Sequence, residues 1–258
     1  MQKKTKFNSI KAHDDLEIRA GCKDVWNAFM LEGAIFTPHD IPYCPTICNE
    51  LPKEMYTWEE AVSIHRQKIK AGELDYFINA YINWYIDDYK FDSPRVRTVN
   101  NTINKYNCIW NYYDCAWKVI KHFAGIITPD YSTNQDFPEP QKTFSTYKMR
   151  AFGYWIGKQG KQVINNVRWG TEETFEYCFN GIPINSIVSI GTVGGGPRNL
   201  KHRKNFEVGF YKMIDVLKPK VIIVYGSANA ECFDYARKQG ILIVSFKSRT
   251  AKFYEGRK

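Results

Sequence analysis

Short apolar runs alternate with amphipathic segments along most of this chain. Six runs, rich in β-branched or aromatic residues, each lead into a polar or glycine-bearing loop. These runs are residues 80–86, 125–127, 162–167, 186–190, 221–224 and 241–246. Between them, helical spacing of apolar residues extends over 112–123, 147–159, 205–217 and 230–238. Buried strands that alternate with helices predict βα units around a parallel sheet.

The fold class that follows is α/β. Two architectures fit the alternation: an open, doubly wound sheet and an incomplete or distorted (β/α) barrel. We favour the barrel, because the strands are evenly spread and nearly every one ends in polar residues. In either architecture, the loops that follow the strands gather at one edge of the sheet, where α/β proteins build their sites.

The first part of the chain mixes helical and loop patterns. Its clearest element is a helix over Trp58–Lys70, with Thr57 as the N-terminal cap and Gly72 as the stop. We therefore divide the chain into a mostly helical N-terminal segment, residues 1–72, and an α/β main domain, residues 73–258. The N-terminal segment is expected to pack on the main domain.

Polar residues that follow the predicted strands are the first candidates for chemistry. Four are expected to be catalytic: Asp87, Asp88, Asp130 and Arg168. Two carboxylates from separate strands can hold a divalent metal ion or divide the roles of general acid and base. Arg168 can bind a phosphate or carboxylate through two hydrogen bonds. The structural alternative is that the aspartates are ordinary helix caps and turn residues.

A glycine-rich loop followed by cations is the second candidate. The sequence from Ser186 to Phe206 reads SIVSIGTVGGGPRNLKHRKNF. Glycines let a backbone approach a ligand closely and adjacent cations favour an anion, so the loop predicts contact with phosphate. It lacks the Lys-Ser or Lys-Thr pair of a Walker A motif and a clean G-x-G-x-x-G, so a tight turn is the alternative. The expected ligand-binding residues are Tyr131, Ser132, Trp169, Thr192, Gly194, Gly195, Gly196, Arg198, Lys201, Arg203, Tyr225, Gly226 and Ser227.

Composition narrows the setting of this chemistry. The net charge of +9 favours partners that carry phosphate, such as nucleic acid or nucleotides. Hydrophobic residues make up 44% of the chain and aromatic residues 16%, which excludes a disordered protein. No apolar run approaches the ~20 residues of a membrane span. We therefore expect a cytoplasmic protein with no membrane partner.

The seven cysteines are odd in number and scattered, which argues against a disulfide framework. Cys44 and Cys48 lie close behind His39 and Asp40, as ligands of a metal site would. Zinc modules need a second close pair, which this chain lacks, so buried structural thiols are the favoured interpretation. A divalent metal at the carboxylates stays open, and the cofactor is otherwise unknown.

Four segments of the chain carry a family resemblance. They are YIDDYKF from Tyr85, GIITPDYS from Gly125, VINNVRWG from Val163 and CFNGIPINS from Cys178. In this order they resemble an uncharacterised family of phage, plasmid and other mobile-element proteins, the domain-of-unknown-function 4417 family. The resemblance covers roughly residues 75–246. The family patterns read I-S-P-D-F-S and V-I-P-N-V-R-W, where this chain has Thr128, Tyr131 and Asn165 instead.

The resemblance implies a genomic context rather than a chemistry: a phage or mobile element, and a role in replication, host takeover or defence evasion inside a bacterial host. Two hypotheses follow. The first is a protein that acts on or binds a nucleotide or nucleic acid at the strand-end face. The second is a non-catalytic module that binds a host protein or a nucleotide signal. Clustering of the carboxylates and Arg168 around a pocket would favour an enzyme, whereas a flat basic stripe would favour binding alone.

Overall fold

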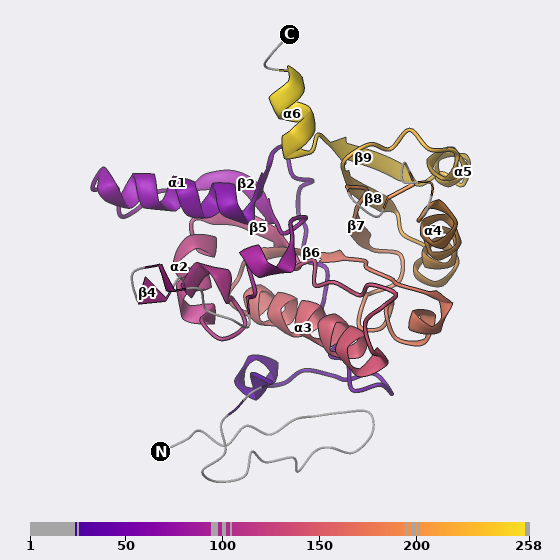
Figure 1. The fold of residues 1–258 in the computed structure, drawn as a ribbon, viewed down its shortest axis with the longest axis horizontal. Helices are drawn as coiled ribbons and strands as arrows, with labels where there is room; N and C mark the ends of the chain where they lie inside the picture. Colours follow the sequence, from indigo (N-terminus) through magenta and orange to yellow (C-terminus); the bar gives the residue numbers. More distant parts are fainter. Residues whose placement is uncertain are drawn as a thin grey trace.

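A parallel sheet of seven strands forms the centre of the molecule (Figure 1). The computed structural model describes residues 24, 26–93, 98–99, 102–103, 105–193, 196–197, 200 and 202–255. In spatial order, the strands are β1 (Met55–Thr57), β2 (Ile78–Asn83), β5 (Phe123–Ile127), β6 (Gln162–Asn166), β7 (Ile187–Gly191), β8 (Val221–Tyr225) and β9 (Leu242–Phe246). The strands lie across the sheet in the order in which they occur along the chain, as in a barrel. In a doubly wound sheet, this order reverses part-way.

The sheet curls into an incomplete barrel. Three strands separate β2 from β8, a separation of about 19 Å if it is measured along the sheet. Yet the ring of Tyr85, just after β2, stacks on the ring of Tyr225 at the end of β8, with centroids 5.3 Å apart and planes 14° apart. Strands β1 and β9 are the two edges, so the barrel does not close. The α/β class and the incomplete barrel predicted from the sequence are both confirmed.

The longer helices lie outside the curl of the sheet (Figure 1). They are α1 (Trp58–Lys70), α2 (Tyr113–Ile120), α3 (Glu139–Lys158), α4 (Arg203–Leu217) and α5 (Glu231–Lys238), whereas α6 (Arg249–Glu255) lies apart from them at the top of Figure 1. Short 3-10 helices occur at Ala28–Leu31, Asp88–Lys90, Lys105–Asn107 and Glu172–Glu176, and a small hairpin joins β3 (Thr98–Val99) to β4 (Thr102–Ile103). Helices α1 to α3 pack on the half of the sheet from β1 to β6, while α4 and α5 lie on the half from β7 to β9.

Helix α1 has the bounds and caps predicted from the sequence. The hydroxyl of Thr57 accepts a hydrogen bond from the backbone N–H of Glu60, and the Glu60 carboxylate accepts one from the Thr57 N–H in return. This reciprocal capping box satisfies two backbone donors that a helix start otherwise leaves unpaired. The expected C-terminal stop is also present, because Gly72 adopts a left-handed φ of 79°.

Other boundaries differ from the predicted ones. The helix predicted over 112–123 ends at Ile120, and Phe123 instead begins β5. Helix α3 begins at Glu139, well before the predicted start at 147. The prediction missed its first turns because their polar residues dilute the apolar spacing by which a helix is recognised. Strand β1 was not predicted at all. It has three residues and follows no apolar run, yet it pairs in parallel with β2.

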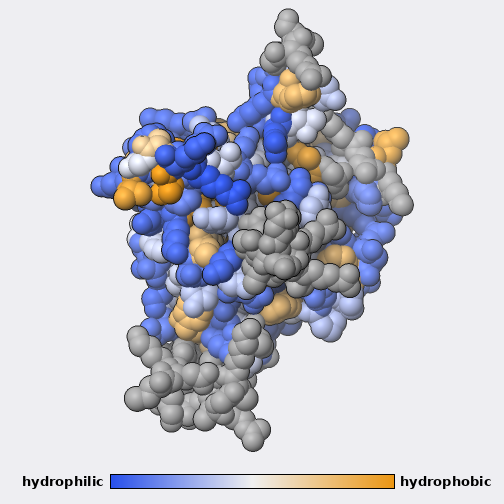
Figure 2. Space-filling model, turned by 60° about the vertical axis from the view of Figure 1, so that its left-hand side comes forward, coloured by the Kyte–Doolittle hydropathy of each residue, from blue (hydrophilic) through white to orange (hydrophobic). Residues whose placement is uncertain are grey.

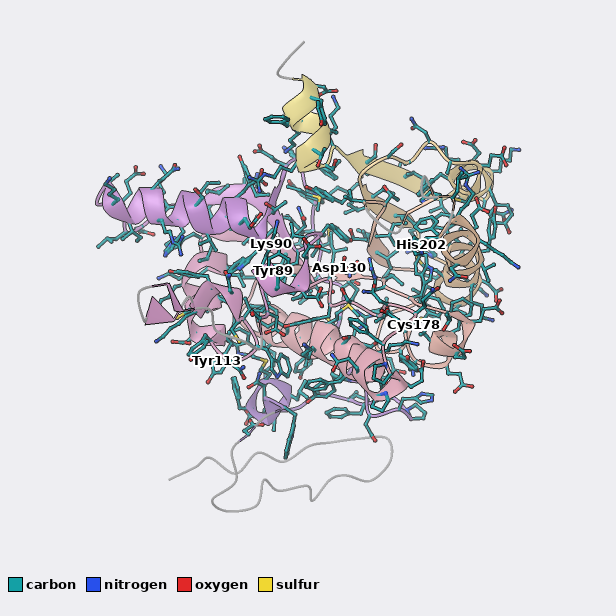
Figure 3. The ribbon with its side chains drawn as sticks, in the orientation of Figure 1. Tyr89, Lys90, Tyr113, Asp130, Cys178 and His202 are labelled. Atoms are coloured by element: carbon teal, nitrogen blue, oxygen red, sulfur yellow. The ribbon has the colours of Figure 1, made fainter. Side chains whose placement is uncertain are left out.

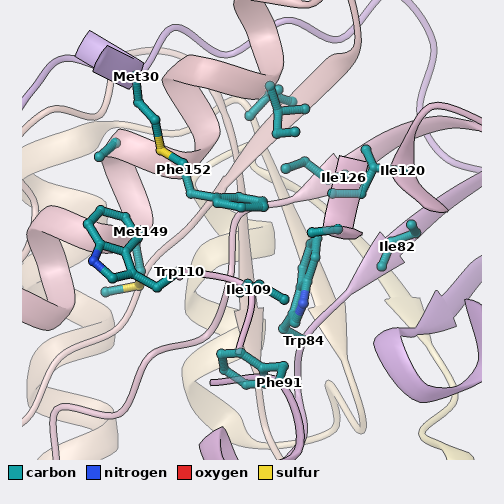
Figure 4. Packing of buried hydrophobic residues seen from close by; sticks show 14 of the residues in the cluster. Met30, Ile82, Trp84, Phe91, Ile109, Trp110, Ile120, Ile126, Met149 and Phe152 are labelled. Carbon is teal, nitrogen blue, oxygen red and sulfur yellow. The ribbon is translucent and has the colours of Figure 1, made fainter. Parts of the chain in front are cut away.

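Three buried clusters divide the core. The largest lies between the β1 to β6 half of the sheet and α1 to α3, where Trp84, Ile126 and Phe152 pack together (Figure 4). A second cluster lies between the other half of the sheet and α4 and α5, around Phe210 and Phe233. The third occupies the concave face and includes Tyr85 and Tyr225. The concave face is therefore filled by side chains at its centre rather than open as a pore.

The segment before β1 inserts into the sheet. Ile47 exchanges two backbone hydrogen bonds with Val163 in β6, of 2.9 and 2.7 Å. Strand β7 pairs with β6 only further along, at Asn165 and Asn166. The side chain of Asn165 also donates to the carbonyl of Cys44 (2.8 Å). The sheet is thus split at the amino ends of β6 and β7 and continuous at their carboxyl ends.

A fully buried arginine holds α3 against the carboxyl end of β6. Arg150 donates from Nε to the carbonyl of Asn180 (3.1 Å), from Nη1 to that of Asn166 (3.0 Å) and from Nη2 to that of Cys178 (3.1 Å). Burial lowers the pKa of Arg150 to about 10, so the guanidinium keeps its charge at neutral pH. Carbonyl dipoles, with no carboxylate among these bonded partners, compensate this charge.

Replacing Arg150 with methionine should destabilise the protein by about 2–4 kcal/mol, because two buried carbonyls and one partly buried carbonyl lose the guanidinium donor. Arg150→Lys should recover only part of this loss, since one ammonium group cannot reproduce the planar fork. Urea unfolding measures the change. The matched control is Lys158→Met in the same helix, at an exposed position, which should stay within about 0.5 kcal/mol of the unsubstituted protein. Equal stability of Arg150→Met and the control would contradict the role given to Arg150.

Candidate functional site

A chain of hydrogen bonds crosses the carboxyl ends of the central strands. The Tyr85 hydroxyl donates to Oδ1 of Asn166 (2.9 Å) and lies 2.7 Å from the hydroxyl of Ser189, which therefore donates to it. Nδ2 of Asn166 donates in turn to Oδ1 of Asp130 (2.7 Å). Nη1 of Arg168 lies 3.5 Å from Oδ2 of the same carboxylate. Side chains from four different strand ends are thereby held in one network.

Tyr85 is the rigid centre of this network. Burial, followed by the nearby Asp130 carboxylate, raises the pKa of its hydroxyl well above the ordinary value, so it stays protonated and can donate. Its ring lies over Gly191 at the end of β7, where a Cβ atom would come within 2.6 Å of Cδ1 of Tyr85. The ring of Tyr85 also stacks on the ring of Tyr225. Tyr85 therefore fixes Asn166, and through it Asp130, in one position.

A second carboxylate, Asp88, lies next to this network. It accepts hydrogen bonds from the backbone N–H (3.0 Å) and the hydroxyl (2.8 Å) of Ser132, two residues after Asp130. Burial raises the pKa of Asp88 above the ordinary value; the bonds from Ser132 oppose this shift and the charge of Asp130 adds to it. Two carboxylates in different environments can divide a proton-donating and an anionic role.

A cavity of about 600 Å³ opens beside the network, between the ends of β6 and β7 and the start of α4. Its wall is formed by Thr133, Asn134, Gln135, Asp136, Val167, Arg168, Trp169, Gly170, Ile190, Gly191, His202, Asn205 and Phe206. Arg168 is 27% exposed there. In the part of the chain that the structure describes, its guanidinium has Asp130 as its one polar partner, so most of its donors remain for a ligand.

Two contacts hold the far wall of the cavity in place. Nε1 of Trp169 donates to the carbonyl of Asn205 (3.2 Å), and Nδ2 of Asn205 donates to Oε1 of Gln135 (3.3 Å). Trp169 packs directly on Gly209 of α4, where a Cβ atom would lie 2.2 Å from its ring nitrogen. In Figure 3, Asp130 appears at the centre of the molecule and His202 towards α4. The loop after β5, the loop after β6 and α4 thus form one rigid wall.

The glycine-rich loop has a structural explanation in its described part. Gly196 lies against the backbone of Thr192, whose carbonyl oxygen would be 2.3 Å from an added Cβ. Gly226 has a φ of 119° and would place a Cβ equally close to the Thr192 hydroxyl. That hydroxyl donates to the carbonyl of Ser227 (3.0 Å). Close packing around Thr192 therefore requires these glycines, whatever the loop binds. Gly194, Gly195, Arg198 and Lys201 lie outside the described residues.

The structure brings together only some of the residues expected from the sequence. Asp88, Asp130, Arg168 and Ser132 meet at the network, and Trp169 lines the cavity. Three other candidates lie elsewhere: Asp87 is exposed, Tyr131 is buried under Lys148 and Phe91 on the helix side of the sheet, and Arg203 donates to the carbonyl of Pro197. Tyr225 makes no hydrogen bond to the described side chains of the network but packs on the ring of Tyr85 beside it.

Three central residues were missed by the sequence analysis: Tyr85, Asn166 and Ser189. All three lie within or next to apolar strand runs. A tyrosine or a single polar residue in such a run is compatible with an ordinary buried strand, so it does not indicate a site. The signal that was available is the polar pair Asn165 and Asn166 inside a run that otherwise reads as buried. Buried amides need hydrogen-bond partners, so such a pair indicates a polar network at that strand end.

Neither a metal-ligating cluster nor a membrane-spanning helix is found among the described residues. Within the described ranges, no three side chains of His, Cys, Asp or Glu gather closely enough to hold a metal ion. Cys44 is buried and its pKa is raised to about 12 by burial, which is the behaviour of a structural thiol. The divalent metal at the carboxylates stays a prediction. None of the described helices is both long and apolar enough to cross a membrane.

These features define an α/β half-barrel protein with a polar network and a cavity at the carboxyl ends of its central strands. The chain belongs to the family described as a domain of unknown function (DUF4417), which it matches over residues 37–247. The resemblance noted from four sequence segments is thereby confirmed, over a longer stretch than expected.

Two curated phage proteins are similar to this chain. The Gene 1 protein of Mycobacterium phage L5 is 26% identical over 145 residues, which is 56% of this chain and 56% of the phage protein. The Gene 1 protein of Mycobacterium phage D29 is 24% identical over 145 residues, which is 56% of this chain and 48% of that protein. The chain therefore spans about half the length of the curated relatives it matches. No solved structure matches it.

The raised pKa of Asp88 predicts a change of stability with pH. A carboxyl whose pKa is higher in the folded than in the unfolded protein favours folding while it is protonated, and this contribution is lost as pH rises through the folded pKa. Asp88→Asn removes the titration, so its stability relative to the unsubstituted protein should increase from about pH 4 to pH 7. Urea midpoints at both pH values, with Asp87→Asn measured alongside, test this. A difference that does not change with pH would contradict it.

The contact between Trp169 and α4 predicts an unusual cost for a helical alanine. Gly209→Ala should destabilise the protein by about 1–3 kcal/mol, because the new methyl group overlaps the indole, although alanine favours helices. The matched control is Gly157→Ala in α3, whose Cβ would first meet the flexible end of Ile47 at 3.0 Å. It should be neutral or stabilising. Both are measured by urea unfolding, and equal effects would argue against close packing at Trp169.

Proposed function

We propose that this protein binds a phosphate-bearing ligand, a nucleotide or nucleic acid, at the carboxyl ends of β5 to β7, in the cytoplasm of a bacterial host. The observation that carries the proposal is the position of Arg168. Its guanidinium lies on the wall of the cavity and, among the residues that the structure describes, has a single, long contact of 3.5 Å to Asp130. An arginine oriented in this way, with free donors, matches the geometry of a phosphate.

The surroundings of Arg168 support an anionic ligand. The N-terminal end of α4 borders the cavity at His202 and Asn205, and no described side chain caps this end of the helix. Unpaired backbone N–H groups and the helix dipole favour negative charge at such a position. The net charge of +9 adds a long-range attraction for phosphate compounds.

The carboxylates would give a catalytic form of this proposal its chemistry. Asp88, whose pKa burial raises, is the candidate proton donor, and Asp130, held between Asn166 and Arg168, is the second carboxylate of the site. The alternative is a module that binds a nucleotide signal or a host protein without turnover. Where Figure 2 colours the surface, apolar side chains form small groups among hydrophilic ones.

Equilibrium binding tests the proposal. The unsubstituted protein should bind at least one member of a panel of nucleotides and single-stranded oligonucleotides. Arg168→Gln should weaken that binding about tenfold or more, since hydrogen bonds to charged groups contribute about 1.5–3 kcal/mol. The control is Arg237→Gln at an exposed position of α5, which should leave affinity unchanged. Absence of binding across both classes of ligand would refute the proposal.

The same preparations separate the enzyme from the binding module. Phosphohydrolase and nuclease activity is measured with and without Mg²⁺ or Mn²⁺, using the ligands that bind. If the site is catalytic, Asp130→Asn should abolish turnover while binding persists, and Asp215→Asn on the exposed side of α4 should behave as the unsubstituted protein. Binding without turnover under all conditions would establish the module.

A further inference from the structure

The cavity beside Arg168 also indicates which of the two ligand classes it accepts. Resting on the proposed function, we infer that the ligand is a single nucleotide, with its phosphate at Arg168 and the start of α4 and its base between Trp169 and the amides of the loop after β5. A nucleic acid chain is the competing occupant. Charge, size and an unpaired hydroxyl distinguish the two.

The charges on the wall fit one phosphate better than a chain of phosphates. Among the described wall residues, Arg168 is the one arginine or lysine, and Asp136 carries the opposite charge. Two further carboxylates lie near Arg168: Asp130 contacts its guanidinium, and Asp88 is close enough for the charge of Arg168 to oppose the rise that burial causes in its pKa. Proteins that hold a nucleic acid backbone line its path with several cations, because each phosphate must be neutralised. A wall with little net charge cannot neutralise the phosphates of such a chain, but it can hold one phosphate at Arg168.

The size and chemistry of the cavity fit a small ligand. Its volume of about 600 Å³ falls within the range of about 300–1,000 Å³ that is usual for small-molecule sites. Trp169 provides an aromatic ring on which a base can stack. Asn134 and Gln135 provide amides that can both donate to and accept from the edge of a base.

A buried hydroxyl on the same wall supplies independent support. Thr133 is 1% exposed, and its Oγ1 makes no hydrogen bond among the described residues. An unpaired buried hydroxyl lowers the stability of the free protein and so needs an explanation, and a hydrogen bond to a bound ligand would supply one. The backbone carbonyl of the same residue lies against Gly170, where a Cβ would come within 2.4 Å. Thr133 is thereby fixed at the junction of the two loops that border the cavity.

Isothermal titration calorimetry of the full chain tests the inference. The probes are AMP, GMP, CMP and UMP, inorganic phosphate, and a single-stranded oligonucleotide, each at low and at moderate salt. We expect at least one mononucleotide to bind tenfold or more tightly than inorganic phosphate. Thr133→Val, which keeps the shape and removes the hydroxyl, should weaken that mononucleotide at least threefold and raise the urea midpoint of the free protein.

The matched control is Thr146→Val in α3. Thr146 is also fully buried, but its hydroxyl donates to the carbonyl of Lys142 (3.2 Å). This variant should lower the urea midpoint and leave nucleotide affinity unchanged. The opposite responses of two buried threonines distinguish a ligand-directed hydroxyl from a structural one.

The outcomes that overturn the inference differ from those that overturn the proposed function. Tight, salt-dependent binding of the oligonucleotide without binding of any mononucleotide would exclude the single nucleotide and leave the proposed function standing. Equal affinity for inorganic phosphate and the mononucleotides would show that the base is not recognised, with the same consequence. Unchanged nucleotide affinity in Thr133→Val would remove the hydroxyl from the site. Failure of every phosphate compound to bind would refute both.

Discussion

The candidate site depends on one buried cation. Arg150 binds the backbone carbonyl of Asn166, while the side chain of the same asparagine holds Asp130 and accepts from Tyr85. Its other two bonds go to Cys178 and Asn180, on the segment that follows β6. A guanidinium without a carboxylate partner is costly to bury, so the surrounding carbonyls must keep their positions to compensate it. The carboxyl end of β6 is consequently held from the helix side as well as by strand pairing.

This constraint determines how the two halves of the protein meet. The amino ends of β6 and β7 are separated by the segment around Ile47, so the halves join through a short stretch of strand pairing at Asn165 and Asn166. Arg150 reinforces the same stretch from the helix side. A site built at this junction receives residues from both halves: Asp130 and Arg168 from one side, Ser189 and the start of α4 from the other. Rigidity at the junction keeps these groups in register.

The elements that the sequence predicted well are those with local causes. Helix α1 has its cap, its first-turn acids and its stop within the helix and its flanks, so its bounds were predictable. The βα alternation is likewise a property of consecutive residues. Strand β1 was not predictable, because its three residues are strand only by pairing with β2. The polar first turns of α3 were not predictable for the same reason: tertiary packing stabilises them as helix, and it buries Lys142 and Ser145.

The site was predictable only where polarity follows a strand. Asp88, Asp130 and Arg168 come after apolar runs, and the parallel arrangement brings such positions together. Tyr85 could not be identified in this way, because a tyrosine after β2 reads as core in any sequence. Its role comes from the curl of the sheet, which brings it against Tyr225 across three intervening strands.

The same contact explains how the half-barrel stays curled without closing. A complete barrel is held in shape by pairing between its first and last strands, but β1 and β9 here remain edges. The stacked tyrosines connect β2 to β8 across the concave face, and the backbone N–H of Arg249 donates to the Tyr225 hydroxyl (3.0 Å). The side chain of Arg249 then pairs with Glu59 at the start of α1 (2.8 Å), which links α6 to the first half. Because Tyr85 belongs both to this closure and to the network that holds Asp130, the curvature of the sheet and the geometry of the site are set by the same side chain.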